Sequence, residues 1–288
     1  MPSRIAVPKT YKLYLGGEFG RSESGRSYPV TDPRGRFLAN AAQASRKDAR
    51  DAVVAARRAF GPWWGATAYN RGQVLLRVAE VMEGRREQFA TELAAAEGWA
   101  LRRAPAMVDA AIDRWVWYAG WTDKIATVFG AANPVAGPYF CLTIPEPTGV
   151  VAVLAPQTSS LLGLVSVLAP VIAAGNTAVV VASQNRPLPA VTLSEVLATS
   201  DVPSGVVNVL TGRTAELAPW LAAHDDVNAL DLCGAPAAIR ADLEATAAGT
   251  VKRVRSAPAA EPDWTRPPDT GRLRSFVEAK TVWHPVGT

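Results

Sequence analysis

Three short β-branched apolar runs recur in the second half of the chain, at 149–156, 177–182 and 206–210. Runs of this length, bounded by glycine, proline or polar residues, predict buried strands. The segments between them, 161–174 and 187–199, have the length and apolar content of helices. Strands that alternate with helices in this way predict parallel βαβ units with helices on both faces of one sheet. Ligands bind such sheets at the carboxyl ends of the strands, so polar residues 157–160 lie where a site is expected.

Amphipathic segments fill most of the first half. Apolar residues recur every three or four positions along 49–60 and 70–97, which predicts two helices with one buried face each. The sequence at 45–48, Ser-Arg-Lys-Asp, resembles a capping box at the start of the first helix. Gly98 predicts the end of the second helix, and Pro105 the first turn of a third.

Glycine and proline mark the irregular parts of the chain. The pair Gly16-Gly17 between two short apolar runs predicts a hairpin. Prolines near both ends of 137–147 predict an extended segment. Four prolines among small and charged residues at 257–271 predict a linker, and partial alternation in 272–283 predicts a strand after it. A further helix, a strand and an alanine-rich helix are expected at 214–223, 227–232 and 236–248.

Composition indicates an ordinary soluble globular protein, since 49% of the 288 residues are apolar and the net charge is only +4. No apolar run approaches the roughly 20 residues that span a membrane. The first residues, Met1 to Ile5, lack the apolar core of a signal peptide, so we expect a cytoplasmic protein without a membrane partner. The densest basic run, 252–255, is short and has no interleaved aromatic residues, which argues against a nucleic-acid partner.

Cysteine and histidine are too few for a framework of disulfides or a metal site. The two cysteines, Cys141 and Cys233, have no metal-ligand spacing, and we expect both to be inert buried thiols. The two histidines, His224 and His284, cannot bind zinc without carboxylates, and we expect no metal. Aromatic residues at helical spacing near Trp115 are typical of a packed core.

Three stretches resemble, in order, the cofactor domain of the aldehyde dehydrogenase superfamily: 149–156, 169–177 and 203–212. The resemblance also covers 11–98 and returns at 279–283. It implies a Rossmann-like open, mostly parallel α/β sheet, with a bridging arm and a C-terminal strand that serve oligomerisation.

The implied domains follow from this resemblance. Residues 1–256 are expected to form the cofactor-domain-like part, with 137–147 as its bridging arm. A proline-rich linker at 257–271 then leads to a C-terminal oligomerisation strand at 272–288. The catalytic domain that the family places between these parts is missing.

The resemblance also shows which catalytic groups have changed. The nucleophilic cysteine belongs to the missing domain, and Arg255-Ser256-Ala257-Pro258 stands where the family has its general-base glutamate. The oxyanion asparagine corresponds to Thr158, whose shorter side chain cannot reach as far, and we expect residues 158–160 to cap the following helix instead. Cys233 and Cys141 have no recognisable base, and Glu195 and Glu244 are expected on solvated helix faces. We therefore expect no catalytic residue in this chain.

The cofactor positions are altered as well. The family's ribose-binding lysine and glutamate correspond to Val181 and Gln184, neither of which offers a charged hydrogen-bond partner. The pyrophosphate loop corresponds to Cys233-Gly234-Ala235, so Gly234 keeps the close backbone approach while Ala235 lacks the hydroxyl. The sequence therefore predicts no cofactor site, with NAD(P) bound weakly if at all.

Three functions remain open. The chain resembles the degenerate, non-catalytic second module of two-module aldehyde dehydrogenases, which implies a pseudoenzyme subunit that stabilises or regulates a catalytic aldehyde dehydrogenase. The alternatives are an NAD(P)-dependent aldehyde oxidoreductase with a divergent active site and a dinucleotide-binding sensor. The expected partner is a full-length aldehyde dehydrogenase subunit, held through the strand at 272–288 and the helix at 236–248. A homodimer is the competing arrangement.

Overall fold

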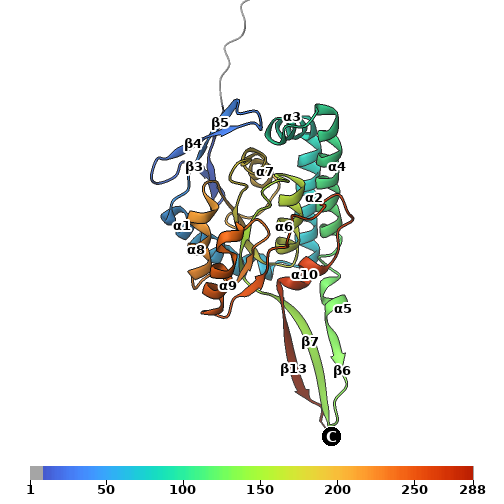
Figure 1. Cartoon of the computed structure of the whole chain (residues 1–288). Helices are drawn as coiled ribbons and strands as arrows, with labels where there is room; N and C mark the ends of the chain where they lie inside the picture. Colours follow the sequence, from blue (N-terminus) through green and yellow to red (C-terminus); the bar gives the residue numbers. More distant parts are fainter. Residues whose placement is uncertain (1–8, 288) are drawn as a thin grey trace, which may run out of the picture.

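The computed structural model describes residues 9–287, and its main feature is a seven-stranded sheet of order β12-β11-β8-β9-β10-β2-β3 (Figure 1). Its parallel strands are β8 (Val150–Leu154), β9 (Thr177–Val181), β10 (Val207–Leu210), β11 (Ala229–Asp231) and β12 (Arg253–Arg255). The antiparallel edge is β2 (Leu13–Leu15) and β3 (Glu18–Gly20). The predicted open, mostly parallel α/β sheet and the hairpin at Gly16-Gly17 are confirmed. Met1 to Ile5 and Thr288 lie outside the described residues.

Side chains of the central strands alternate between two cores. Val151 and Val153 of β8 belong to one buried cluster, whereas Val150 and Ala152 belong to another. The helices that pack against the first core are α2 (Ala68–Gly84), α3 (Arg86–Glu97), α4 (Ala104–Ala119), α6 (Leu162–Ala173) and α7 (Leu188–Ala198). The second core is covered by α1 (Arg46–Gly65), α8 (Thr214–Ala223) and α9 (Arg240–Ala248). Both faces of β8 and β9 are therefore buried, which explains their continuous apolar sequence.

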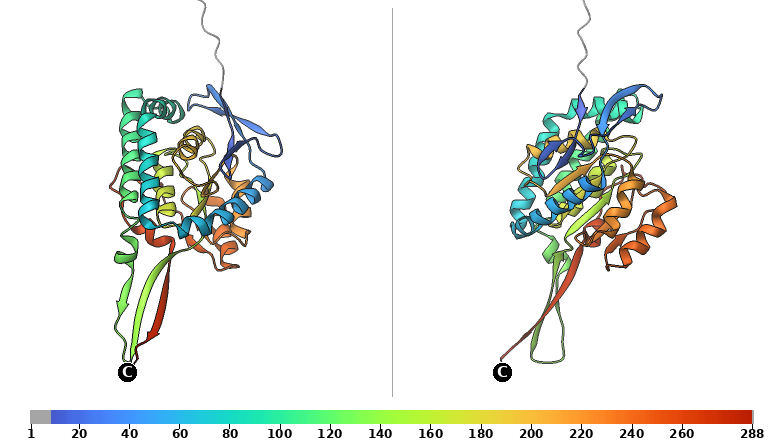
Figure 2. Two further views of the ribbon diagram at one scale, coloured as in Figure 1. Left: turned by 180° about the vertical axis from the view of Figure 1, so that it is seen from behind. Right: turned by 90° about the vertical axis from the view of Figure 1, so that its left-hand side faces the viewer.

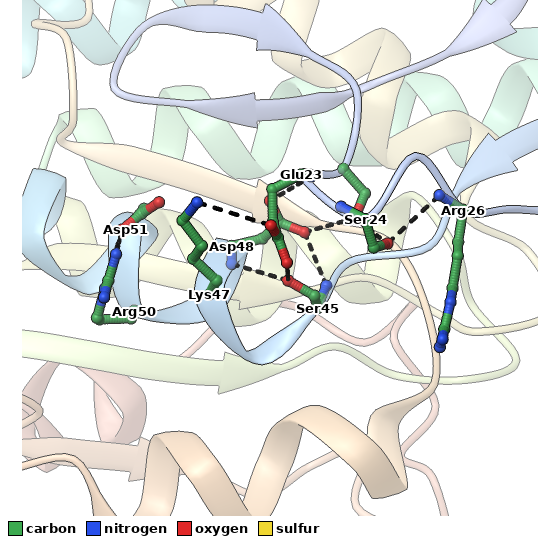
Figure 3. Close-up of polar contacts among 9 residues, drawn as sticks. Glu23, Ser24, Arg26, Ser45, Lys47, Asp48, Arg50 and Asp51 are labelled. Carbon is green, nitrogen blue, oxygen red and sulfur yellow. Dashed lines mark hydrogen bonds and ion pairs between the residues drawn. The ribbon is translucent and has the colours of Figure 1, made fainter.

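The first helix begins as its sequence predicts. Ser45 Oγ accepts a hydrogen bond from Asp48 N at 3.3 Å, and Asp48 Oδ2 accepts one from Ser45 N at 2.7 Å, so the capping box is present (Figure 3). The single helix predicted over 70–97 is wrong, because the chain breaks at Arg85 into α2 and α3. Gly84 weakens the helix there, and Arg85 turns to pair with Glu195 of α7. Gly98 ends α3 in the left-handed conformation at φ 71°.

A long three-stranded sheet projects from one end of the body (Figures 1 and 2). Its order is β13-β7-β6, from β6 (Ala131–Asn133), β7 (Tyr139–Pro147) and β13 (Val277–Pro285). β13 is antiparallel to β7 over nine residue pairs, from Val277 opposite Pro147 to Pro285 opposite Tyr139. The predicted extended segment at 137–147 thus forms the middle strand of this sheet, which we call the arm.

The tail differs from its prediction in its first residues. Residues 271–275 form a short helix, α10 (Gly271–Ser275), rather than the start of a strand. Leu273 and Phe276 are three residues apart and fully buried, so a helical turn directs both into the core. The strand starts only at Val277.

Residues 257–270 contain no helix or strand and take no part in the central sheet. Their proline-rich composition predicts a free linker, yet Trp264 packs against the main core. The segment is therefore docked on the domain. Trp264 packs against the core, and Arg114 donates hydrogen bonds to two carbonyls of the segment.

Smaller elements complete the described part. A second three-stranded sheet has the order β1-β5-β4, from β1 (Thr10–Tyr11), β4 (Ser27–Thr31) and β5 (Phe37–Ala42). The remaining helices are η1 (Leu101–Arg103), α5 (Ile125–Phe129) and η2 (Ala237–Ile239). Among residues 9–287, no helix combines the length and apolar character that crossing a membrane requires.

Candidate functional site

A polar cleft of about 580 Å³ lies at the carboxyl ends of β8, β9 and β10, beside the turn after β4. Its lining includes Gln157, Thr158, Gln184, Asn185, Arg186 and Arg213. The cleft is where a parallel sheet is expected to bind a ligand. Two guanidinium groups, those of Arg186 and Arg213, are the cations on its walls.

Thr158 is exposed in the turn between β8 and α6. Its N–H donates to Glu261 Oε2 at 2.9 Å, and its carbonyl accepts from Arg186. Of the predicted capping residues 158–160, Ser159 is the one whose side chain bonds to the first turn of α6, since its Oγ accepts from Gly163 N at 2.9 Å. Thr158 therefore contributes its backbone to this turn.

Two carboxylates occupy successive amides of the same turn. Glu261 Oε1 accepts from Ser159 N at 2.9 Å, beside the bond from Thr158. Glu97 Oε1 accepts from both the N–H and the hydroxyl of Ser160, each at 2.7 Å. Burial raises the pKa of Glu97, and the hydrogen bonds from Ser160 oppose this shift. The N–H groups of residues 158–160, in the turn before α6, are thus already satisfied by acids of the chain itself.

The two residues at the family's ribose positions serve the fold. Val181 is fully buried at the end of β9 and belongs to the core beneath α1 and α8. Gln184 lines the cleft, but its backbone N–H donates to Gln157 Oε1 at 3.0 Å and its own Oε1 accepts from Thr214 N at 3.3 Å. Gln184 therefore ties the loop after β9 to the start of α8, and Val181 offers the cleft no polar atom.

Gly234 is required by the chain's own backbone. A Cβ added to Gly234 would lie 1.8 Å from the carbonyl oxygen of Ala155, and Gly234 N donates to Leu154 O at 2.8 Å. Ala235 is 3% exposed, and its carbonyl accepts from Arg240 Nε at 3.0 Å. The resemblance implies that Gly234 lets the backbone approach a pyrophosphate. In this structure Gly234 instead lets the backbone approach the end of β8.

Neither cysteine has the surroundings of a nucleophile. Cys233 is 6% exposed, and burial, followed by the charge of Asp231, raises its pKa to about 11. Cys141 is buried in the arm, with Asn133 Nδ2 at 3.6 Å from its sulfur. Both are free thiols, as predicted, and Cys233 is neutral near pH 7.

The other groups that the sequence singles out are dispersed. Glu195 is not on a purely solvated face as expected, because it pairs with Lys9 at 2.6 Å and with Arg85. Glu244 is partly exposed on α9, and His284 is exposed on the arm. Within residues 9–287, no group of three or more histidine, cysteine, aspartate or glutamate side chains could hold a metal ion.

A second cavity, of about 550 Å³, lies at the start of α1, where polar groups face one another (Figure 3). Asp48 accepts from Ser22 Oγ at 2.7 Å and from Glu23 N at 3.1 Å, in addition to Ser45. These contacts satisfy the buried carboxylate and fix the β3–β4 connection on the helix. The polar groups here therefore have a structural role.

Sequence reasoning missed four charged residues that hold the loops near the cleft or lie buried beneath them: Glu97, Asp231, Glu261 and Arg272. Asp231 is fully buried in β11 and pairs with Arg272 of α10. The signal was an aspartate within the apolar run 227–232. Glu97 and Glu261 gave no signal, because each meets its partner through the fold alone.

The protein-family model described as "Aldehyde dehydrogenase family" matches residues 19–257. The chain is 32% identical over 251 residues to a mitochondrial benzaldehyde dehydrogenase of Antirrhinum majus, covering 84% of this chain and 46% of that protein. It is 32% identical over 259 residues to the cytosolic 10-formyltetrahydrofolate dehydrogenase of Mus musculus, covering 87% and 28%. The chain thus spans less than half the length of these curated relatives.

Solved structures agree with this match. HpcC from Thermus thermophilus is similar with a TM-score of 0.81 and 30% identity, over 85% of this chain and 47% of that one. A putative aldehyde dehydrogenase from Burkholderia cenocepacia has a TM-score of 0.80 and 30% identity, over 84% and 51%. By fold and by sequence, the chain belongs to the aldehyde dehydrogenase family.

Proposed function

We propose that this chain is a non-catalytic aldehyde dehydrogenase-family subunit that assembles with a catalytic aldehyde dehydrogenase and stabilises or regulates it. One observation carries the proposal: the polar groups at the carboxyl edge of the sheet are committed to the chain itself. The amides of Thr158 and Ser159 bind Glu261, and Gly234 packs on Ala155. The edge that binds ligands in such folds is used here for internal packing.

Aldehyde oxidation needs a thiolate, donors for the oxyanion, a base and a nicotinamide that accepts hydride. Cys233, the thiol nearest this edge, is buried and neutral. An oxyanion would need free hydrogen-bond donors at the turn around Thr158. The N–H groups of Thr158 and Ser159 already donate to the carboxylate of Glu261. These two features support a chain without aldehyde dehydrogenase chemistry of its own.

The arm supports the proposed assembly with a catalytic aldehyde dehydrogenase. Its exposed apolar side chains include Phe140, 50% exposed, and Trp283, 57% exposed, and Trp283 packs edge to face with Tyr139 at 5.8 Å between ring centroids. β13 also forms one edge of the arm sheet and pairs with no second strand among residues 9–287, so its outer backbone groups can accept a strand of another subunit. Apolar side chains beside a free strand edge are typical of a subunit contact.

We take the partner to be a full-length aldehyde dehydrogenase, because the resemblance places the tail of one subunit against the catalytic domain of its neighbour. The family match of this chain ends at residue 257, and α10 and β13 lie beyond it, after residues 258–270. A full-length subunit supplies the surface that a second copy of this chain lacks. Co-expression of both chains followed by native mass spectrometry tests this assembly, with a homodimer as the competing result.

A dinucleotide-binding sensor is the second candidate, and the polar cleft favours it. Arg186 and Arg213 are placed on its walls, and cations of this kind attract phosphate groups. Calorimetry with NAD⁺ and NADP⁺ separates the sensor from the non-catalytic subunit, since only the sensor binds in the micromolar range.

The absence of catalysis is tested with the isolated chain. We expect no NADH or NADPH above the blank when the chain is mixed with either oxidised cofactor and a panel of short aldehydes. Turnover that is lost in Cys233→Ala and kept in Cys141→Ala would overturn the proposal and support a divergent oxidoreductase. The Cys141 variant is the matched control, because that thiol is also buried but lies in the arm.

A further inference from the structure

Residues 257–270 run across the body between β12 and α10, and Figure 1 shows them as the dark loop that passes over α6 and α4. The segment, which we call the strap, has no secondary structure to hold it in place. Its position therefore depends on a few side-chain and backbone contacts.

Glu261 is the central contact of the strap. Its two carboxylate oxygens accept from the successive amides of Thr158 and Ser159, each at 2.9 Å. The indole Nε1 of Trp264 donates to Glu261 Oε1 at 3.1 Å and holds the carboxylate in this orientation. A bidentate, charge-assisted contact of this kind is among the stronger hydrogen-bonded arrangements in proteins.

Trp264 covers the first turn of α6. A Cβ added to Gly163 would lie 3.0 Å from Trp264 Nε1, so the indole approaches the helix where a side chain is lacking. The guanidinium of Arg272, in α10, lies 5.4 Å from the centre of the same ring. The tryptophan thus joins the strap to both α6 and the tail.

Helix α4 holds the strap's backbone. Arg114 is 7% exposed, and its Nη2 donates to the carbonyls of Trp264 at 2.7 Å and Arg266 at 3.0 Å. The hydroxyl of Tyr118, one turn further along α4, donates to Asp269 O at 3.4 Å. A buried guanidinium needs such acceptors, so loss of the strap would leave Arg114 without these two bonds.

We propose that the strap is an autoinhibitory device that closes the carboxyl edge of the sheet by seating the Glu261 carboxylate on the turn before α6. The carboxylate is itself an anion bound at this turn, so the ligand class that it excludes is a small anion, carboxylate or phosphate. When the strap leaves, the amides of Thr158 and Ser159 become free, while Ser160 stays bound to Glu97. This inference does not depend on assembly with a partner, because Glu261, Thr158 and Ser159 all belong to this chain.

The test uses the full chain labelled with ¹⁵N. Glu261→Gln removes the charge and keeps the shape, and Asp263→Asn is the matched control, because Asp263 is exposed and bonds only to Thr265. We expect exchange of the Thr158 and Ser159 amides to rise about tenfold or more in E261Q and to stay unchanged in D263N. Circular dichroism confirms that each variant is folded.

Titration with acetate and with inorganic phosphate then identifies the excluded anion. The Thr158 and Ser159 signals should shift saturably with one or both anions in E261Q and should not respond in the unmodified chain. Unchanged amide protection in E261Q would overturn the proposal. Equal anion shifts in both proteins, or no anion response in the opened variant, would also overturn it. None of these outcomes bears on subunit assembly, so the two proposals fail separately.

Discussion

Arg272 of α10 donates to Asp231, a carboxylate that is fully buried in strand β11. The same guanidinium faces the ring of Trp264 in the strap. One arginine therefore joins the central sheet, the strap and the helix that leads into the arm. Burial raises the pKa of Asp231, and the charge of Arg272 opposes that rise.

Replacing Arg272 with methionine should lower the free energy of unfolding by about 3–5 kcal/mol, because it leaves Asp231 buried without its counter-charge. Urea unfolding followed by tryptophan fluorescence measures this loss. Arg253→Met is the matched control, since Arg253 and Glu278 are 41% and 47% exposed and their pair is screened by solvent. The control should change stability by at most about 1 kcal/mol. Equal losses in both variants would contradict the role assigned to Arg272.

Gly234→Ala should prevent folding or lower the free energy of unfolding by about 3 kcal/mol or more, since the added methyl would overlap the carbonyl of Ala155. Gly20→Ala is its control, because a Cβ at Gly20 meets nothing within 4 Å. Thermal unfolding compares the two. A G234A protein as stable as G20A would show that β8 and the loop after β11 do not pack as closely as described.

Glu97 predicts a pH dependence of stability with a defined sign. Its pKa is raised in the folded state above the ordinary value of 4.5, chiefly by burial, so folding favours the protonated acid. Its stabilising contribution is complete below pH 4.5 and is lost as the pH rises through the raised pKa. Glu97→Gln cannot titrate. We therefore expect the stability of the natural chain relative to E97Q to fall as the pH rises above 4.5, and a flat difference would contradict this.

Dinucleotide affinity should be low. The absence of two or three hydrogen bonds at Val181, Gln184 and Ala235, two of them to charged groups, weakens binding by about 3 kcal/mol, which is over a hundredfold. Gln184→Glu keeps the acceptor for Thr214 N and adds a charge that binds a ribose diol better, so it should raise affinity, whereas Gln184→Ala should not. Calorimetry that gives a micromolar Kd for the unmodified chain would refute the prediction.

The sheet could be predicted from sequence because its strands are buried on both faces and read as uninterrupted apolar runs. β8 and β9 show this best, since every residue of each is buried. The break between α2 and α3 could not, because the apolar period continues through Arg85, whose partner Glu195 lies 110 residues away. Local patterns carry no information on such distant partners.

The site and the tail were less predictable because their contacts join residues that are far apart in the sequence. Asp231 and Arg272 are 41 residues apart, and Glu97 and Ser160 are 63 apart. In α10, the spacing of Leu273 and Phe276 suits a helix as well as an irregular strand, and burial against the core decides for the helix. The strap has the composition of a free linker. Trp264 is its one large apolar residue, and it packs against the main core.

The proposed assembly rests on the arm, so its test changes the arm alone. Deleting 272–288 would also remove Leu273 and Phe276 from the core, whereas Phe140→Ser with Trp283→Ser alters only exposed side chains. Phe37→Ser is the control, because Phe37 is 56% exposed on β5, outside the arm.

The most direct measurement is the mass of the species formed when this chain is co-expressed with a full-length aldehyde dehydrogenase from the same source. We expect native mass spectrometry to find both chains in one complex, which persists with F37S and is lost with the F140S/W283S variant. Separate species in every sample, with this chain alone as a monomer or homodimer and the catalytic enzyme unaffected, would contradict the account.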